Sequence, residues 1–511
     1  MLTERAAHLA VPNPHEFCQQ PRHIQTSKFN YAYSQIYKEP IEQPDKQPGS
    51  LLIVVHTAFL QRPPDMSLLL KYTGLGRYIP RIEPSMTTFV FITAACFLPA
   101  LLLVLFYVLD LQSRQTDPRA CRKLGLRIQS HLADEHHERY SGPGQGQQNG
   151  KAAWRVKSLW IYPIKSCRGV ELNGGAITGT GMEYDRQFCF AQLTSKFPVA
   201  HDAPLEEKAQ HKWKFITQRS IAAMAKIKTE VWLPDPSSPT YSVKHPSVQS
   251  GGVLVIKFPK LDTAEGPMGK IVGSLTSLVA AREHSVHIPI NPTPGQIAKC
   301  NYTTDDMEIW KDSPKSLIMA STDKGDNWIQ NLRFFLGITN HLALFRVSRE
   351  QPREVYRCAP RKEELGYQSQ VSFQDAYPLH ILNLASVHDV ASKLDKGAFS
   401  LGALNFRPNI VITGGNAYDE DSWKRIMIGN YEYYVACRTV RCLLPNVNPA
   451  TGVRHGSEPN KTLKTHRRID EGDPKNACLG MQMVPAKEYS KIKVGDTIEV
   501  LETGEHFYIK Q

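Results

Sequence analysis

An uncharged apolar run from Thr87 to Leu109 constrains the fold of this 511-residue chain more than any other feature of its sequence. As an α-helix with a rise of about 1.5 Å per residue, the run would be about 35 Å long, which is enough to cross a bilayer with some tilt. Pro99 lies inside the run, and membrane helices tolerate an internal proline. Because the run is apolar on all sides, we predict a transmembrane helix over residues 85–111 rather than a buried helix of a soluble domain.

The segments on either side of this run are polar. Residues 1–84 are rich in Pro, Gln, His and Lys, and their one apolar stretch, residues 51–60, is too short to span a bilayer. We predict that residues 1–84 are disordered and that residues 112–153 form a linker. Basic residues flank the run on both sides, so the positive-inside rule gives only a slight preference for a cytosolic C-terminal side.

Composition excludes several classes of protein. The net charge of +12 fits an anionic partner of any kind, but it also fits an ordinary soluble surface. The ten cysteines contain no C-x-x-C pair and no repeated spacing, which argues against a zinc ribbon or an iron–sulfur domain. Scattered cysteines of this kind are typical of reduced thiols facing the cytosol. We expect at least one of them to be functional.

From Trp154 onward the sequence changes to short alternating segments separated by Gly, Pro and Asp. This pattern predicts a mainly β chain with some α (α+β), with helices near residues 323–336 and 384–394. We expect two packed β-barrel-like modules, 154–335 and 336–505. The predicted strands lie within residues 156–164, 175–193, 227–233, 240–245, 251–258, 284–290, 307–312, 409–414, 425–436 and 491–502.

One polar segment follows the first of these strands. After Pro163 the chain presents Lys165, Ser166 and Arg168. A turn of this composition can bind an anion through a charge, a hydroxyl and free backbone N–H groups. Solvated turn charges are the alternative interpretation.

Two further segments carry reactive or charged side chains. Arg407 precedes Pro408, which predicts an extended backbone and a guanidinium that binds phosphate, with Asn409 offering a donor and an acceptor to a heterocycle. A structural ion pair and a turn Asn are the alternatives. Cys442 follows Arg441 at a strand end, a setting typical of a reactive thiolate, although an isolated cysteine is often inert packing.

In this order and spacing, the three segments resemble the MOSC family, in which a MOSC N-terminal β-barrel module precedes a MOSC domain. Within the family, the chain resembles the amidoxime-reducing components and their fungal relatives. The resemblance covers residues 154–505 and includes a membrane helix upstream. One departure concerns Thr439, where many relatives have Cys, and another concerns Val440, where a hydroxyl residue can contribute.

The resemblance implies a molybdopterin-type molybdenum cofactor with Cys442 as the protein's ligand to molybdenum. It places Asp375 near the metal, so that Cys442 and Asp375 form the catalytic pair. The remaining implied site residues hold the phosphate and pterin of the cofactor: Lys165, Ser166, Arg186, Arg407, Asn409 and Arg441.

The implied function is that of a membrane-anchored oxidoreductase which reduces N-hydroxylated compounds, such as amidoximes and hydroxylamines, to amidines or amines. The sequence has no flavin, haem or iron–sulfur signature, so electrons must come from a partner. The resemblance implies cytochrome b5 with its NADH-dependent reductase, no nucleic acid, and the mitochondrial outer membrane, anchored through residues 87–109 with the catalytic part in the cytosol.

Two alternatives remain. A cofactor carrier or sulfurase-like protein would use the same fold without reducing N-hydroxylated substrates. The sulfurases also contain a pyridoxal-phosphate module with a Schiff-base Lys, and residues 154–505 leave no room for one. A membrane-anchored β scaffold without catalysis is the other alternative, and it would leave the Arg, Lys and Cys residues without a role.

Overall fold

The computed structural model describes residues 85–116, 118–143, 154–195, 211–260, 283–348, 352–395 and 399–510, together with residues 202, 204, 206 and 397. The predicted disordered segment 1–84 lies outside the described residues. Helix α3 spans Met86–Thr116 and contains Pro99. Within it, Met86–Leu103 is the one stretch of the described residues that is long and apolar enough to cross a membrane, judged by length and composition alone.

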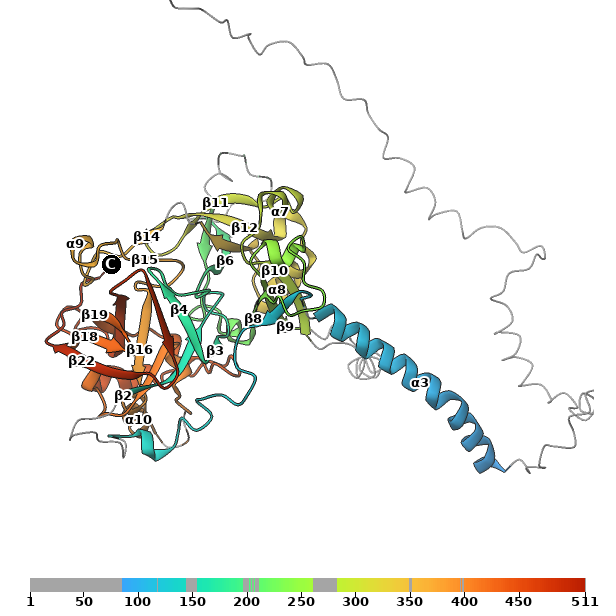
Figure 1. Ribbon diagram of the computed structural model, residues 1–511, viewed down its shortest axis with the longest axis horizontal. Coiled ribbons are helices and arrows are strands. Elements are labelled where there is room, and N and C mark those ends of the chain that lie inside the picture. The colour runs from blue at the N-terminus through green and yellow to red at the C-terminus, as the bar shows by residue number, and fades with distance from the viewer. Residues whose placement is uncertain are drawn as a thin grey trace, which may run out of the picture. The chain divides into compact units, whose positions relative to one another are not determined.

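The rest of the described chain is mainly β with some helix, as predicted (Figure 1). Seven strands close into a ring in the order β17-β16-β20-β19-β18-β22-β2, because β2 pairs with β22 on one side and with β17 on the other. Their bounds are β2 Trp154–Ile161, β16 Leu379–Asn383, β17 Ile410–Thr413, β18 Trp423–Ile428, β19 Tyr431–Val440, β20 Cys478–Pro485 and β22 Thr497–Thr503. Strand β3 (Val170–Leu172) extends the sheet beside β2.

A second, smaller barrel closes from five strands in the order β11-β12-β13-β6-β7. Its strands are β6 Phe188–Thr194, β7 Lys212–Phe215, β11 Thr303–Glu308, β12 Lys315–Ser321 and β13 Leu342–Val347. A four-stranded antiparallel sheet contains β1 Cys121–Lys123, β8 Lys228–Pro234, β9 Val253–Pro259 and β10 Glu283–Pro289. One continuous hydrophobic core connects these sheets to the seven-stranded ring, since Ile164, Phe188, Leu254 and Leu379 all belong to it.

The remaining elements are short. Helix α8 (Asn327–Leu336) and helix α10 (Leu384–Ser392) confirm the two predicted helices. Segment 240–245, predicted as a strand, instead forms a turn that leads into α5 (Pro246–Gln249), where His245 and Pro246 begin the helix. The other elements are strands β4 Gly174–Thr178, β5 Gly181–Met182, β14 Arg353–Glu354, β15 Gln370–Val371 and β21 Tyr489–Lys493, helices α7 Pro294–Lys299, α9 Lys362–Leu365 and α11 Asn460–His466, and 3-10 turns η2 Glu138–Tyr140, η3 Ala222–Lys226, η4 Thr322–Lys324, η5 Ala403–Phe406, η6 Asp419–Ser422 and η7 Leu444–Asn446.

The two modules do not follow the boundary predicted between residues 335 and 336. Strand β2 belongs to the seven-stranded ring although it comes first in the sequence, and β13 belongs to the five-stranded barrel although it lies beyond the boundary. Alternating patterns predict strands, but they do not specify which distant strand each one pairs with. The interleaving brings the turn after β2 to the end of β19.

Residues 118–143 lie in the predicted linker, and here the structure differs from the prediction. Strand β1 pairs with β8, Leu132 is buried, and the Glu135 carboxylate accepts a hydrogen bond from the Ala403 N–H at 2.8 Å. This stretch is polar in sequence and contributes few apolar anchors, so its packing depends on pairing with partners far along the chain. It is part of the folded body rather than a free tether.

Candidate functional site

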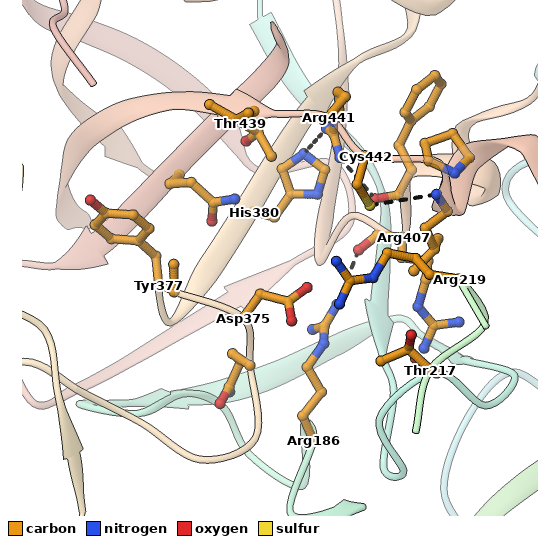
Figure 2. A pocket seen from close by; sticks show the side chains of 18 of the residues that line it. Arg186, Thr217, Arg219, Asp375, Tyr377, His380, Arg407, Thr439, Arg441 and Cys442 are labelled. Carbon is orange, nitrogen blue, oxygen red and sulfur yellow. Dashed lines mark hydrogen bonds between the residues drawn. The ribbon is translucent and has the colours of Figure 1, made fainter. Parts of the chain in front are cut away.

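The eight residues predicted to bind the cofactor or take part in catalysis line one cavity of about 200 Å³, whereas Arg168 of the first polar turn is not among its lining residues. Several chain segments meet at the cavity, among them the turn after β2, the segment from η5 to β17 and the end of β19. Figure 2 shows Arg186, Asp375, Arg407 and Cys442 around it. Its predicted lining residues are Lys165, Ser166, Arg186, Asp375, Arg407, Asn409, Arg441 and Cys442. Sequence positions up to 277 residues apart are therefore neighbours, as Lys165 and Cys442 show.

Left-handed backbone positions shape the cavity wall. Ser166, Arg186 and Arg407 all have positive φ, at 64°, 49° and 52°. The extended backbone predicted for Arg407 is wrong, because this residue closes the 3-10 turn η5 and its N–H bonds to the Leu404 carbonyl. The residue before a proline avoids the right-handed helical region, and the closing turn selects the left-handed one. Strained positions of this kind cluster at functional sites.

Two buried arginines, Arg407 and Arg441, line the cavity, and neither is paired with a carboxylate of the described residues. The Arg441 guanidinium donates to the Leu479 carbonyl (2.8 Å from Nε) and to His380 Nε2 (2.6 Å from Nη2). The Arg407 guanidinium lies over the Tyr162 ring, 4.1 Å from its centroid. Neither arginine has an ion pair within the part of the chain that the structure describes. Burial lowers the pKa of Arg441 to about 9 and that of Arg407 to about 10, so both stay positively charged at pH 7.

Lys165 and Asp375 form an ion pair at the cavity wall. The Lys165 ammonium donates to Asp375 Oδ1 at 2.6 Å and to the Phe373 carbonyl at 2.7 Å. The Trp310 indole N–H donates to the same Asp375 oxygen at 3.1 Å. Desolvation acts to raise the pKa of Asp375, but the charge and hydrogen bond of Lys165 outweigh it and hold this pKa well below its usual range. Asp375 is therefore ionised at neutral pH.

Asn409 and Arg186 support the same wall. The Asn409 amide is buried and donates to the Trp160 carbonyl at 3.1 Å, while its oxygen accepts the His380 N–H at 3.2 Å. Arg186 pairs with the buried Asp185 and donates to the Arg407 carbonyl at 3.2 Å. The structure therefore uses the Asn409 amide to hold neighbouring segments together rather than leaving it free for a heterocycle.

Cys442 lies at the junction of the narrow cavity and a wider one of about 810 Å³. Its side chain is exposed, and its sulfur accepts a long contact from the Leu444 N–H at 3.5 Å. Asp375 also borders both cavities. The wide cavity is lined in addition by Arg219, Trp310 and Tyr356. A small molecule entering there reaches the thiol and the carboxylate together.

Comparisons with known proteins agree with this arrangement. Residues 153–260 match the family model described as the MOSC N-terminal beta barrel domain, and residues 368–499 match that of the MOSC domain. The chain is 36% identical over 346 residues to the mitochondrial amidoxime reducing component 2 of Bos taurus, covering 67% of this chain and 82% of the relative. The chain belongs to the MOSC family.

Two further MOSC relatives show the spread of similarity. The mitochondrial amidoxime-reducing component 1 of Homo sapiens is 27% identical over 350 residues, which is 68% of this chain and 82% of the relative. The mitochondrial amidoxime reducing component 2 of Macaca fascicularis is 39% identical over 318 residues, which is 62% of this chain and 74% of the relative. The alignments leave about a third of the chain uncovered.

The cavity fits the molybdenum cofactor with which the MOSC family is associated. Arg407 Nη2 and Thr439 Oγ1 are buried polar atoms of the cavity lining, and neither has a hydrogen-bond partner among the described residues. Such groups are costly unless a ligand satisfies them. The guanidinium groups of Arg407 and Arg441 have no carboxylate partner in the described part of the chain, so an anionic ligand would offset the cost of burying their charge. Among the described residues, no group of three or more His, Cys, Asp or Glu is placed to hold a metal ion.

Residue-by-residue reading of the sequence missed three members of the MOSC site. His380 accepts a hydrogen bond from Arg441, and burial followed by the nearby positive charge of Arg441 keeps its pKa well below the usual range. Arg219 stacks on Trp310, with the guanidinium carbon 4.3 Å from the ring centroid. Neither His380 nor Arg219 lies in a motif. Trp310 lies in the predicted strand segment 307–312, where an unusual positive φ of 58° turns it toward Asp375.

Proposed function

We propose that this MOSC protein is a membrane-anchored molybdenum-cofactor oxidoreductase that reduces N-hydroxylated substrates, such as amidoximes and hydroxylamines, to amidines or amines. The observation that carries the proposal is the combination of unpaired buried arginines, orphaned polar atoms and an accessible thiol in one cavity. An anionic cofactor would neutralise the arginines and satisfy the orphaned atoms. The amidoxime-reducing relatives supply the reaction class.

Six of the lining residues would hold the cofactor. Arg407 and Arg441 would bind its anionic groups through hydrogen bonds that are strong because both partners are charged. The turn that carries Lys165 and Ser166 would bind the phosphate end, and Arg186 would support it by fixing the Arg407 backbone. The Cys442 thiolate would be the protein's ligand to molybdenum, a role that suits a soft sulfur donor.

When bound, the cofactor supplies two-electron reduction at molybdenum, which is chemistry that no side chain of this chain provides. The protein's own contribution is to orient the substrate and to manage charge. Asp375 is ionised and borders the wide cavity, so it can accept hydrogen bonds from the N–H groups of an amidoxime and stabilise the more basic amidine product. The Trp310 indole N–H donates to Asp375 Oδ1 and so helps to hold the carboxylate in place.

We further propose that helix α3 anchors the catalytic body to a membrane, since its exposed apolar length is sufficient to span one. The relatives are named mitochondrial components, and this supports a mitochondrial location. Within it we propose the outer membrane, with the catalytic part in the cytosol. Electrons would come from cytochrome b5 and its NADH-dependent reductase. The basic net charge of +12 suits an acidic donor protein, because complementary charge speeds encounter.

The test is to express the full chain in a cofactor-producing host and to purify it in detergent. Molybdenum per chain and NADH-dependent benzamidoxime reduction with cytochrome b5 and its reductase are then measured. Cys442→Ser is expected to abolish turnover, while Cys300→Ser, at an exposed cysteine that lines neither cavity, is expected to leave it unchanged. Protein purified without molybdenum, or full activity of Cys442→Ser, would refute the proposal. Metal retained without turnover would instead favour a cofactor carrier.

A further inference from the structure

A second pair of cysteines lies beside the substrate cavity and has no part in the function proposed above. Cys358 precedes helix α9, and Cys437 lies in strand β19. Both belong to one small hydrophobic cluster that also contains Tyr377 and Tyr508. Cys437 is completely buried, whereas Cys358 is only half-buried. The pair therefore combines one thiol that solvent can reach with one that it cannot.

The two thiols lie within hydrogen-bonding reach of each other. Cys437 donates a hydrogen bond to the Cys358 sulfur, and the Tyr377 hydroxyl also hydrogen bonds to the pair. The Cys358 sulfur accepts the Ile509 N–H at 3.2 Å, and when protonated it donates to the Phe507 carbonyl at 3.6 Å and to the Ile509 carbonyl at 3.8 Å. These contacts hold both sulfurs in place and attach the end of the chain to them.

The backbone of Cys358 supports a specific role for its side chain. Its φ is +56°, in the left-handed region that residues other than glycine rarely occupy. This conformation is less favourable than an ordinary one, so the surrounding structure must maintain it. The strained turn directs the sulfur toward Cys437 and the segment that contains Ile509.

The two thiols differ in acidity. The hydrogen bond from Cys437 outweighs burial and lowers the pKa of Cys358 to about 6, while burial raises the pKa of Cys437 well above its ordinary value. At pH 7 most of Cys358 is thus the thiolate, which is the form that reacts with peroxide. Cys437 stays protonated and keeps its proton for the hydrogen bond. A half-exposed thiolate next to a second thiol is the usual arrangement of a redox-sensing cysteine.

We propose that Cys358 and Cys437 form a peroxide-reactive pair, with Cys358 as the attacking thiol and Cys437 as the resolving thiol. In the first step the Cys358 thiolate attacks hydrogen peroxide, the O–O bond breaks, and a sulfenic acid and hydroxide form. In the second step the Cys437 sulfur attacks the Cys358 sulfur, the S–O bond breaks, and a disulfide and water form. Peroxide takes up the two electrons that the two thiols lose.

The disulfide would alter one wall of the substrate cavities. Tyr377 lines the narrow cavity, and Tyr508 lines both cavities. Oxidation removes the thiol hydrogen that Cys437 donates and the sulfur charge that accepts the Ile509 N–H, so both tyrosines lose fixed neighbours. The pair therefore connects the redox state of the surroundings to the shape of the cavity. The experiments below measure thiol chemistry alone, so their result does not depend on whether the proposed function is correct.

The test treats the full chain, purified in detergent, with one equivalent of hydrogen peroxide, and then maps its peptides by mass spectrometry without reduction. A Cys358–Cys437 cross-linked peptide pair is expected, and dithiothreitol should reverse it. Alkylation of Cys358 by iodoacetamide, followed against pH, is expected to be half-maximal near pH 6. Alkylation of Cys358 that rises only above pH 8 would overturn the assignment of the attacking thiol.

Two variants separate the roles of the pair. In Cys437→Ala the sulfenic acid at Cys358 cannot be resolved, so dimedone is expected to label Cys358 after peroxide treatment. In Cys358→Ser, which keeps a small polar side chain at a half-buried position, no cross-link to Cys437 is expected. The matched control Cys300→Ser removes an exposed thiol outside the cluster and should leave the cross-link unchanged. Peroxide-treated wild-type protein in which dimedone labels Cys358 and no cross-link forms would refute the pair.

Discussion

The substitution Arg407→Met tests whether the cavity arginines belong to an anion site or to the structural framework. Arg407 is 9% exposed, stacks on Tyr162, and has a buried Nη2 atom without a hydrogen-bond partner among the described residues. Burial, with a smaller contribution from the nearby charge of Arg186, lowers its pKa from 12.5 to about 10. Because the folded pKa lies below the unfolded one, the charged form destabilises the fold at every pH below about 10.

The size of the effect follows from that shift. At about 1.4 kcal/mol per pKa unit, a shift from 12.5 to about 10 corresponds to about 3 kcal/mol of unfavourable free energy at pH 7. Methionine has a similar length without the charge, and it loses about 1 kcal/mol of cation–π contact with Tyr162. Cofactor-free Arg407→Met is therefore expected to be more stable to unfolding than the wild type by about 1–2 kcal/mol.

Arg467 provides the matched control. It is 6% exposed and stacks on Tyr418 in the same way, but it forms an ion pair with Asp421. Arg467→Met leaves that carboxylate buried and unpaired, so it is expected to cost about 3–5 kcal/mol. The assay is urea unfolding of the cofactor-free proteins at pH 7, followed by tryptophan fluorescence. Equal destabilisation by both substitutions would refute the reasoning, since it would mean that Arg407 has a structural carboxylate partner. Molybdenum content of Arg407→Met from the cofactor-producing host should also fall.

Three further outcomes are expected. Burial raises the pKa of Glu420 from 4.5 to about 7, so the wild type should lose about 3 kcal/mol of its free energy of unfolding between pH 4.5 and pH 8. Glu420→Gln should keep this stability, and urea unfolding across that pH range measures the difference. A Cβ on Gly415 would lie 1.9 Å from the Trp154 ring, so Gly415→Ala should lower the melting temperature by an amount equivalent to about 1–3 kcal/mol, whereas Gly142→Ala, with open space around it, should not. His380→Leu removes a hydrogen-bond acceptor of a cavity arginine, so molybdenum content after gel filtration should fall several-fold while the circular dichroism spectrum stays unchanged.

The identity of the candidate site residues was predictable from the sequence, because the family resemblance assigns a residue type to each motif position. All eight predicted residues do line one cavity. Their individual geometry was not predictable, because it depends on contacts between segments. Arg407 closes a 3-10 turn in the left-handed region instead of entering a strand, and the Asn409 amide bonds to the Trp160 carbonyl and the His380 N–H instead of facing a ligand.

The sequence by itself determined the features that depend on local patterns. An apolar run sets α3, alternation sets most of the strands, and helical spacing sets α8 and α10. Two features were decided by the tertiary structure alone. Strand β2, predicted in the first module, closes the seven-stranded ring formed by strands of the second, and residues 118–143 join the folded body. The tertiary structure also decided which charges are buried without partners and which thiols meet. The periodicity of apolar residues along the sequence reports only on residues that are close in the chain. Strand pairing, the burial of charges and the proximity of Cys358 to Cys437 depend on residues that only folding brings together.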